Sequence, residues 1–363
     1  MPAVHFLVPE GTDDPARPSG GNGYDRRLGA GLAAAGWDVR WYPVAGCWPE
    51  PDPAAGDALA VLLTGLPDGA VLLVDGLVAA SAPAVLTAQA GRLRLVVLVH
   101  MPQDADRPVL AAAAAVVTTS DWTRARLLAR QPLESVHVAR PGADRAEPAT
   151  GTAAGNRLLC VAALAPHKGQ DLLVAALAEL ADRSWHCTLL GPLDRDPAFV
   201  ERLRRQAAGA GIADRVELAG PAVGTALDRA YRSADLLVLP SRTEAYGMVI
   251  TEALGHALPV LATAVGGVPE ALLGAAGADA LCGPKPPSRP AAVSVRAAQY
   301  GPGMLVRPED PGALAGGLRE WLDDAGLRDR LRTAARERRA SLVGWPDTVD
   351  RVAAVLAATA QPA

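Results

Sequence analysis

The sequence predicts an α/β protein built from two doubly wound, Rossmann-like domains. Its 363 residues, 50% of them hydrophobic, exceed what a single hydrophobic core usually organises. The apolar residues are mainly Ala, Val and Leu, with only 2 Phe, which is typical of aliphatic parallel strands covered by Ala-rich helices. Short aliphatic runs also alternate with helix-like segments, and this alternation stops once and then restarts. A sandwich, a barrel or a disordered chain would not give this pattern.

The first domain is expected over residues 1–143. The intervening segments 24–35 and 122–130 have helical composition, and Asp121 is a candidate N-cap for the second of them. Strands and helices in alternation predict a parallel sheet with helical crossovers. The predicted strands of this domain are the aliphatic runs 4–8, 39–44, 71–75, 93–100, 116–120 and 136–140.

The second domain is expected over residues 157–344, after a linker at 144–156 that is rich in small and turn-forming residues. A cluster of prolines predicts an exposed loop over 277–302. From Pro311 onward the pattern is helical, and Trp345-Pro346 marks the start of a final helix at 345–363. The predicted strands of this domain are 158–163, 187–190, 216–219, 236–240, 260–264 and 304–306.

Charge and cysteine usage exclude several classes of function. The net charge is −4 without a basic stripe, which argues against nucleic acid as a partner. The same balance gives no support for docking on anionic lipid, although it leaves peripheral membrane association open. No apolar run is long enough for a transmembrane segment, and the start of the chain lacks a charged leader and a cleavage site, so a cytoplasmic location is expected.

The cysteines point to the same compartment. The 4 cysteines are far apart and contain no C-x-x-C pair. This spacing suggests neither a zinc site nor a disulfide scaffold, and we expect reduced thiols in the core.

The most informative motif runs from Ser241 to Ala253, directly after the predicted strand 236–240. The carboxyl end of a strand is where α/β sheets bind ligands. If Glu244 precedes a helix, the amides of residues 245–247, which are Ala245, Tyr246 and Gly247, can face an anion or a sugar hydroxyl. Glu252 then lies about 12 Å further along the helix axis at 1.5 Å per residue. This separation suits one carboxylate on a sugar and another on the ribose of one nucleotide sugar; the alternative is a solvated helix face.

A second motif, Lys168-Gly169, follows the first predicted strand of the second domain. Almost all basic residues of the chain are Arg, and Lys168 is one of two lysines, so its position is informative. A compact ammonium can neutralise a diphosphate, on which negative charge grows as a glycosidic bond breaks. The alternative is a solvated lysine.

Two features of the first domain point to the same kind of ligand. Gly20 and Gly21 lie in a glycine-rich turn between the first strand and the first helix, where backbone amides can approach a phosphate. His100 ends the strand 93–100 and therefore lies at the ligand edge of the sheet. A plain loop and a structural histidine are the alternatives.

Other polar motifs carry less information. Two D-x-D sequences, at 104–106 and 194–196, lie in polar loops and are expected to be solvated, so no divalent metal is expected. A complete dinucleotide fingerprint, a Walker loop and a G-x-S-x-G elbow are missing from the sequence.

The spacing of Glu244 and Glu252 resembles the E-x7-E signature of retaining family 4 glycosyltransferases, and the resemblance extends over nearly the whole chain. It implies the GT-B fold, in which two Rossmann-like domains face a central cleft and the C-terminal helix crosses back to the N-terminal domain. It also implies that Glu244 contacts hydroxyls of the donor sugar and that Glu252 binds the ribose. Lys168-Gly169 resembles the x-x-K-G segment of that family.

The same resemblance assigns roles in the first domain. Gly20 and Gly21 match the family's N-terminal loop, and His100 matches a histidine that meets the donor sugar. The family often has an Arg five residues before the lysine, where this chain has Ala163, so Arg242 is a candidate for the second diphosphate cation.

Two later turns also match the family. The turn at 266–270 resembles a G-G-x-P-E turn that lines the donor site, and 303–310 resembles the strand and turn that close the second domain. Both are expected to be scaffold, and Glu270 either caps a helix or contacts the ligand.

The expected function is metal-independent, retaining transfer of a sugar from a nucleotide-diphosphate sugar to a hydroxyl of a small-molecule acceptor, without a cofactor. Two rivals stay open: a GT-B sugar-nucleotide epimerase, and a subunit that binds nucleotide sugar without turnover. The expected catalytic residues are Glu244, His100 and Lys168. The expected donor-binding residues are Gly20, Gly21, Lys168, Arg242, Ala245, Tyr246, Gly247 and Glu252.

Overall fold

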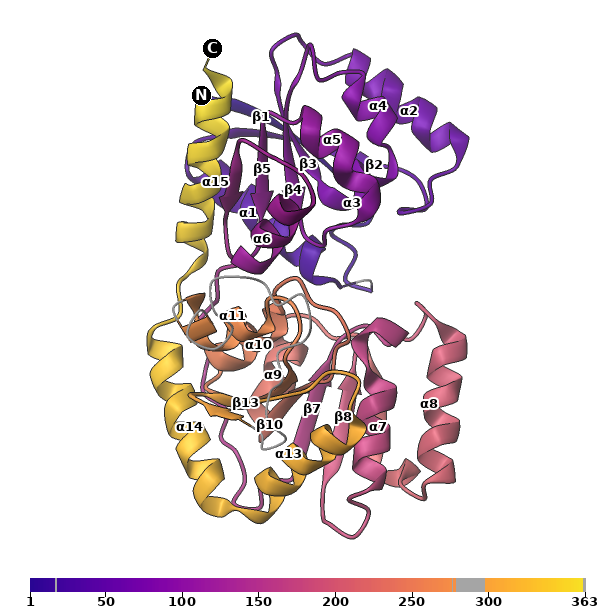
Figure 1. Cartoon of the computed structure of the whole chain (residues 1–363), viewed down its shortest axis with the longest axis vertical. Coiled ribbons are helices and arrows are strands. Elements are labelled where there is room, and N and C mark those ends of the chain that lie inside the picture. The colour runs from indigo at the N-terminus through magenta and orange to yellow at the C-terminus, as the bar shows by residue number, and fades with distance from the viewer. Residues whose placement is uncertain (17, 276, 279–297, 362–363) are drawn as a thin grey trace. The chain divides into compact units, whose positions relative to one another are not determined.

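The computed structural model describes residues 1–361 except 17, 276 and 279–297. The chain forms two compact units (Figure 1). Unit 1 consists of Met1–Asp14, Gly21–Gly142 and Val343–Ala363, and unit 2 consists of Pro15–Gly20 and Ala143–Leu342. In the described residues, no helix has the length and apolar character needed to cross a bilayer.

Unit 1 contains a 6-stranded parallel sheet in the order β2-β1-β3-β4-β5-β6. The direction of winding reverses between β1 and β3, and such a switch point leaves a crevice at the carboxyl ends of the strands. The four central strands of the sheet are almost completely buried and mostly aliphatic, as the sequence predicts for a sheet covered on both faces, whereas the edge strands β2 and β6 are partly exposed. They are β1 Ala3–Pro9, β2 Asp38–Val44, β3 Val71–Asp75, β4 Arg94–Val99, β5 Ala115–Thr118 and β6 Val136–Val138.

Helices cover this sheet, and the C-terminal helix is one of them. Thr348 donates a hydrogen bond to the carbonyl of Arg140 (2.6 Å), and a Cβ at Gly31 would lie 2.3 Å from the side chain of Val349. The final helix is therefore packed tightly into unit 1 (Figure 1). The helices of unit 1 are α1 Gly20–Ala34, α2 Pro53–Thr64, α3 Gly76–Ser81, α4 Pro83–Thr87, η1 Asp104–Asp106, α5 Arg107–Ala112, α6 Asp121–Arg130 and α15 Trp345–Ala360.

Unit 2 contains a 7-stranded sheet in the order β12-β13-β11-β10-β7-β8-β9. Winding starts at β7 and reverses between β7 and β10, which makes that pair the switch point. Among the described strands of this sheet, only β12 is antiparallel, and it pairs with β13. The strands are β7 Arg157–Val161, β8 His186–Leu190, β9 Val216–Gly220, β10 Leu236–Leu239, β11 Val260–Thr263, β12 Ala298–Tyr300 and β13 Gly303–Val306.

The prediction of an exposed loop over 277–302 is wrong near the end of that range, because Ala298–Tyr300 forms the edge strand β12. Residues 279–297 of that range lie outside the described residues. Two hydrophobic clusters fill unit 2, one around Trp321 and Phe199 and the other around Tyr231 and Ile250. The helices are η2 Pro166–Lys168, α7 Gln170–Ala178, α8 Pro197–Gly209, η3 Ala213–Arg215, α9 Thr225–Ser233, α10 Met248–Gly255, α11 Val268–Leu273, α13 Pro311–Asp323 and α14 Ala325–Ala340.

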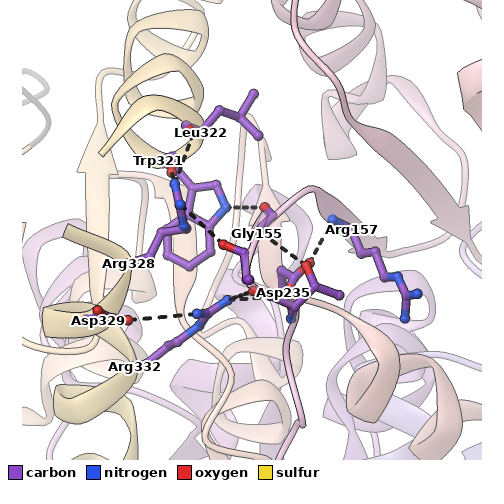
Figure 2. A network of polar contacts seen from close by, with 10 residues as sticks. Gly155, Arg157, Asp235, Trp321, Leu322, Arg328, Asp329 and Arg332 are labelled. Carbon is purple, nitrogen blue, oxygen red and sulfur yellow. Dashed lines mark hydrogen bonds and ion pairs between the residues drawn. The ribbon is translucent and has the colours of Figure 1, made fainter. Parts of the chain in front are cut away.

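The segment 144–156 contains neither helix nor strand and is bonded to unit 2 (Figure 2). Asp235, which precedes β10 and is 1% exposed, accepts hydrogen bonds from the Thr152 amide and hydroxyl (2.8 Å for the hydroxyl). It also accepts from the Arg157 amide (2.9 Å) and the Arg332 guanidinium (3.3 Å). Trp321 Nε1 donates to the carbonyl of Gly155 (2.7 Å). This Asp235 network fixes the start of β7 and β10 relative to α13 and α14.

Two predicted helix starts are wrong. The N-cap of α6 is Ser120, whose hydroxyl accepts from the amide of Thr123 (3.0 Å), while Asp121 is the first helical residue. Helix α1 already begins at Gly20, so Gly20 and Gly21 form its first turn and are not part of the preceding loop. A single sequence does not resolve a boundary of one to four residues, because neighbouring polar or glycine residues are comparable candidates.

Candidate functional site

In unit 2, polar side chains meet at the carboxyl ends of β7 and β10, which flank the switch point. Lys168 follows β7 at the end of η2, and Glu244 follows β10. Lys168 Nζ lies 2.7 Å from Glu244 Oε1, and the hydroxyl of Ser241 donates to the same oxygen (2.9 Å). The structure therefore brings two of the three predicted catalytic residues into direct contact and adds Ser241, which the sequence reasoning missed.

Glycine at position 169 is what allows this contact. Gly169 has φ +71°, and a Cβ there would lie 2.1 Å from the carbonyl oxygen of Pro240. The backbone next to Lys168 thus packs directly on the end of β10, where any side chain would collide. The K-G pair brings the ammonium to Glu244 for this geometric reason.

Glu244 is nearly buried, at 8% exposure, yet one of its oxygens is available. Both hydrogen bonds that the carboxylate of Glu244 makes within the described residues go to Oε1. Oε2 is not among the fully buried unpaired atoms of the described chain, so solvent can reach it. A carboxylate fixed through one oxygen by a cation and a hydroxyl can accept a hydrogen bond from a ligand through the other.

A second glycine pair supports the Glu244 loop from behind. Gly266 has φ +54°, and a Cβ there would lie 1.6 Å from the carbonyl oxygen of Glu244. A Cβ at Gly267 would lie 2.2 Å from the carbonyl oxygen of Ala245, and the Gly267 amide donates to the carbonyl of Glu244 (3.2 Å). The G-G-x-P-E turn thus packs directly against the backbone of the Glu244 loop and supports it. Glu270 is buried in the first turn of α11, and both of its predicted roles stay open.

The helix that follows Glu244 begins later than the sequence predicts. Helix α10 starts at Met248 with Gly247 (φ +96°) as its N-cap, while Ala245 and Tyr246 lie buried in the preceding turn. The amides at the helix start therefore belong to residues after Gly247, and the separation of 12 Å computed for one continuous helix does not apply. Glycine at the cap carries the left-handed conformation that the turn requires.

Glu252 lies on α10 and is oriented by a residue that the sequence reasoning missed. The hydroxyl of Tyr231 on α9 donates to Glu252 Oε2 (2.8 Å). Burial, followed by the charge of Glu252, raises the pKa of Tyr231 well above its usual value, so the phenol stays protonated and keeps donating.

Arg242 is engaged elsewhere. Its guanidinium forms a two-pronged ion pair with Asp171 (2.7 and 2.8 Å) and a further pair with Glu309 (2.9 Å). The Asp171 contact is the main cause that raises the pKa of Arg242. Two carboxylates therefore already pair with Arg242 in this structure, and its role as the second diphosphate cation stays a prediction.

In unit 1, His100 follows β4 and meets two carboxylates near the switch point of that sheet. His100 Nε2 lies 2.8 Å from Asp25 Oδ1 on α1 and 3.4 Å from Asp75 Oδ2 at the end of β3. Gly21 touches the same ring, since a Cβ there would lie 3.2 Å from His100 Cδ2. The structure thus brings together Gly21 and His100, which the sequence singled out, with Asp25 and Asp75, which it did not.

A sequence signal for Asp75 did exist. Asp75 directly follows four buried aliphatic residues of β3, and a charged residue at the carboxyl end of a buried strand lies on the ligand edge. Asp25 gives no such signal, because an aspartate in a helix with polar neighbours is ordinary.

The same three side chains are a possible metal-binding group. Within the described residues, Asp25, Asp75 and His100 form the one acidic and histidine group whose ligand atoms all lie within 4.8 Å of one another. The short Nε2–Oδ1 distance is that of a hydrogen bond, so we assign no metal there.

The expectation that both D-x-D motifs are solvated is wrong for Asp106. It is 2% exposed and accepts from the amide of Gln103 (2.8 Å). Asp196 caps α8 by accepting from the amide of Phe199 (2.8 Å). Asp106 and Asp196 each make a capping hydrogen bond at the start of a helix.

Two doubly wound sheets with polar side chains gathered at their switch points define the GT-B class of glycosyltransferase folds. Solved structures of this class confirm the fold. A sucrose-phosphate synthase from Thermosynechococcus elongatus is 20% identical, with a TM-score of 0.74 over 99% of each chain. The Anabaena protein Alr3699/HepE, solved in complex with UDP-glucose, is 16% identical, with a TM-score of 0.74 over 99% of this chain and 100% of that one.

Sequence comparisons identify the family of a domain in unit 2. Residues 155–324 match the family model described as glycosyl transferases group 1, so unit 2 contains a group 1 glycosyltransferase domain. A D-inositol 3-phosphate glycosyltransferase of Kineococcus radiotolerans is 33% identical over 68% of this chain and 57% of that protein. The protein of the same name from Streptomyces avermitilis is 33% identical over 62% of this chain and 47% of that protein. The chain thus spans about half the length of these curated relatives.

Proposed function

We propose that the chain is a retaining glycosyltransferase that moves a sugar from a nucleotide-diphosphate sugar to a hydroxyl of a small-molecule acceptor. The observation that carries the proposal is the Lys168–Glu244 pair at the switch point of unit 2 (2.7 Å). It combines a cation for the diphosphate with a carboxylate whose second oxygen can bind a sugar hydroxyl. The family match over this unit and the UDP-glucose bound by the Anabaena protein support the same ligand class.

In the proposed reaction, the bond between the sugar C1 and the diphosphate oxygen breaks. The acceptor oxygen forms the new bond to C1 on the same face, and its proton passes to the departing phosphate oxygen. Lys168 stabilises the negative charge that grows on the diphosphate, while Glu244 Oε2 accepts from a sugar hydroxyl and Glu252 accepts from the ribose. The backbone amides near Gly247 complete the donor contacts of unit 2. No metal or cofactor takes part in this scheme.

We also propose a cytoplasmic location. Cys47, Cys160 and Cys187 are free thiols, and burial raises the pKa of Cys160 to about 12, which keeps that thiol protonated. Free thiols are usual in proteins of reducing compartments. The name of the relatives makes D-inositol 3-phosphate the first acceptor to assay.

The proposal is tested by thermal shift of the purified protein in EDTA with UDP, GDP, ADP, TDP and their common sugars. We expect one nucleotide series to raise Tm, and Lys168→Ala and Glu252→Ala to abolish the rise. Arg204→Ala and Glu201→Ala, which change an exposed pair at 3.8 Å, are the matched controls and keep the rise. A Tm that no nucleotide changes refutes the proposal. Binding without sugar transfer or sugar hydrolysis would favour the non-catalytic subunit.

A further inference from the structure

The histidine cluster of unit 1, formed by His100, Asp25 and Asp75, joins three elements at one edge of the sheet. His100 comes from the end of β4, Asp75 from the end of β3, and Asp25 from α1, which follows β1. Asp25 is 1% exposed and Asp75 is 4% exposed, whereas the His100 side chain is 18% exposed. The two carboxylates are therefore buried, whereas solvent can reach the imidazole.

The hydrogen bonds show that Nε2 of the ring carries a hydrogen, whether the ring is neutral or protonated. A carboxylate oxygen can only accept, so the nitrogen 2.8 Å from Asp25 and 3.4 Å from Asp75 carries a hydrogen. That nitrogen is Nε2. Every hydrogen bond that His100 makes within the described residues uses Nε2, so Nδ1 is the ring atom left for a ligand.

The two carboxylates of the cluster have too few hydrogen-bond donors from the rest of the protein. Asp75 Oδ1 accepts from the amides of Leu77 (2.7 Å) and Val78 (3.3 Å). Asp25 Oδ2, in contrast, is fully buried and has no hydrogen-bond partner in the described chain. Burial, and then the charge of Asp25, raises the pKa of Asp75 to about 7. Two adjacent buried carboxylates hold a proton between them or need a neighbouring cation.

The charged groups around the ring all act in one direction. Burial lowers the pKa of His100, but the charge and hydrogen bond of Asp25 and the charge of Asp75 outweigh it and raise that pKa. Tyr24, also on α1, meets the ring edge-on at 5.2 Å and donates its hydroxyl to the carbonyl of Ala139. Burial raises the pKa of Tyr24 far above its usual value, so this phenol stays neutral. Trp345 on α15, which packs against Tyr24, does not titrate.

We propose that Asp25 and Asp75 are positioning residues that hold His100 as an imidazolium, whose Nδ1–H donates a hydrogen bond to an oxygen of the substrate. His100 then supplies a fixed positive charge and a donor, and it does not act as a base. The identity of the substrate rests on the proposed transferase function, whereas the protonation of the ring does not. Neither aspartate touches the substrate in this arrangement; both act through the histidine.

The first test is NMR titration of protein labelled in its 6 histidines, in EDTA and without substrate. His100→Gln identifies the signal. We expect His100 to titrate above the usual value of about 6.5, with a midpoint that Asp25→Asn lowers by at least about one pH unit. Asp75→Asn, in which the amide oxygen can still accept from the Leu77 amide, is the second variant and lowers the midpoint less.

A matched control is available at the protein surface. Glu217 lies 3.6 Å from His186, and both side chains are more than half exposed. Glu217→Gln should leave the midpoint of His100 unchanged, because Glu217 is an exposed residue of unit 2 and is not among the groups that shift the pKa of His100. A neutral His100 at pH 7, or a midpoint that Asp25→Asn does not move, overturns the proposal. A His100 signal that shifts on adding Mg²⁺ or Zn²⁺ to the EDTA-free protein overturns it too, because the cluster would then be a cation site.

The second test is the pH profile of kcat/KM with the nucleotide sugar found by thermal shift. The profile should fall on the alkaline side at the midpoint of His100, and Asp25→Asn should move that limb to lower pH by the shift seen in NMR. A purely structural role of Asp25 would lower the rate at every pH and leave the limb in place. Loss of all nucleotide binding would refute the transferase function, while the NMR titration still decides the protonation of His100.

Discussion

The two units each bury aspartates near a sheet, but they complete the hydrogen bonding of those aspartates to different degrees. Asp235 in unit 2 lies at the amino end of β10 and receives donors from Thr152, Arg157 and Arg332 (Figure 2). Asp25 in unit 1 has the ring of His100 on one oxygen and no partner on the other. A buried carboxylate with a full set of donors stabilises a fold, whereas an incomplete set at the ligand edge retains capacity for chemistry.

The largest effect is expected from breaking the complete network. Asp235→Ala leaves Arg332 and three backbone or hydroxyl donors without their acceptor, and should lower the free energy of unfolding by about 3–5 kcal/mol. Urea denaturation of the purified protein measures this. Asp329→Ala removes an exposed carboxylate 3.9 Å from the same Arg332 and is the control with little effect. Equal losses of unfolding free energy in both variants would show that the hydrogen bonds to Asp235 do not stabilise the fold more than an exposed ion pair does.

A substitution in the incomplete network of Asp25 should lower activity and leave the stability of the fold almost unchanged. Asp25→Asn is expected to lower kcat/KM by about 10–100-fold, as is typical when a partner that orients a site residue is removed. The free energy of unfolding should change by less than about 1 kcal/mol, because an oxygen without a partner loses little on substitution. Steady-state kinetics and urea denaturation of one preparation measure both. A large loss of stability with full activity would place Asp25 in the same class as Asp235.

The pH dependence of stability gives a sharper contrast. The folded-state pKa of Asp75 is raised to about 7, so between pH 4 and pH 7 the folded protein binds a proton that the unfolded chain has lost. The contribution of Asp75 to stability therefore falls as pH rises through this window. Asp75→Asn, which imitates the protonated side chain, should flatten the curve. Parallel curves for the two proteins from pH 4.5 to pH 7.5 would contradict the raised pKa.

The smallest effect is expected from trimming one donor of the complete network. Thr152→Val removes the hydroxyl that donates to Asp235 (2.8 Å) and accepts from the Gly155 amide (3.0 Å), while the shape of the side chain is kept. The cost should be about 1 kcal/mol, the usual net value of a hydrogen bond. The change in Tm, with Thr225→Val on the surface as a comparison, tests this value. A loss as large as that of Asp235→Ala would mean that the network fails as a unit.

Much of the fold could be predicted because its signals are local. Buried parallel strands are continuous aliphatic runs, and their sequence order places β7 before β8 and β10 at the restart of the pattern. The positions of Lys168 and Glu244 were also predictable, because each lies in the segment that follows such a run, at the ligand edge of the sheet. The catalytic roles of Glu244, His100 and Lys168 and the donor-binding role of Glu252 stay predictions.

The features that the sequence did not predict depend on contacts between distant residues. Arg242 is held by Glu309, 67 positions later, and Asp25 meets His100, 75 positions later. Local composition does not encode such pairs. Strand β12 was missed because its three residues follow a proline-rich segment and acquire strand character only by pairing with β13.

The position of α15 has a consequence for synthesis on the ribosome. Unit 1 begins the chain, yet its sheet is covered by a helix that starts at Trp345, after the whole of unit 2. At roughly 5–20 residues per second, the ~200 intervening residues take about 10–40 s to emerge. During that interval the first unit waits with an apolar face open, so nascent chains of this protein should be clients of chaperones that bind apolar surface while unit 2 is being translated.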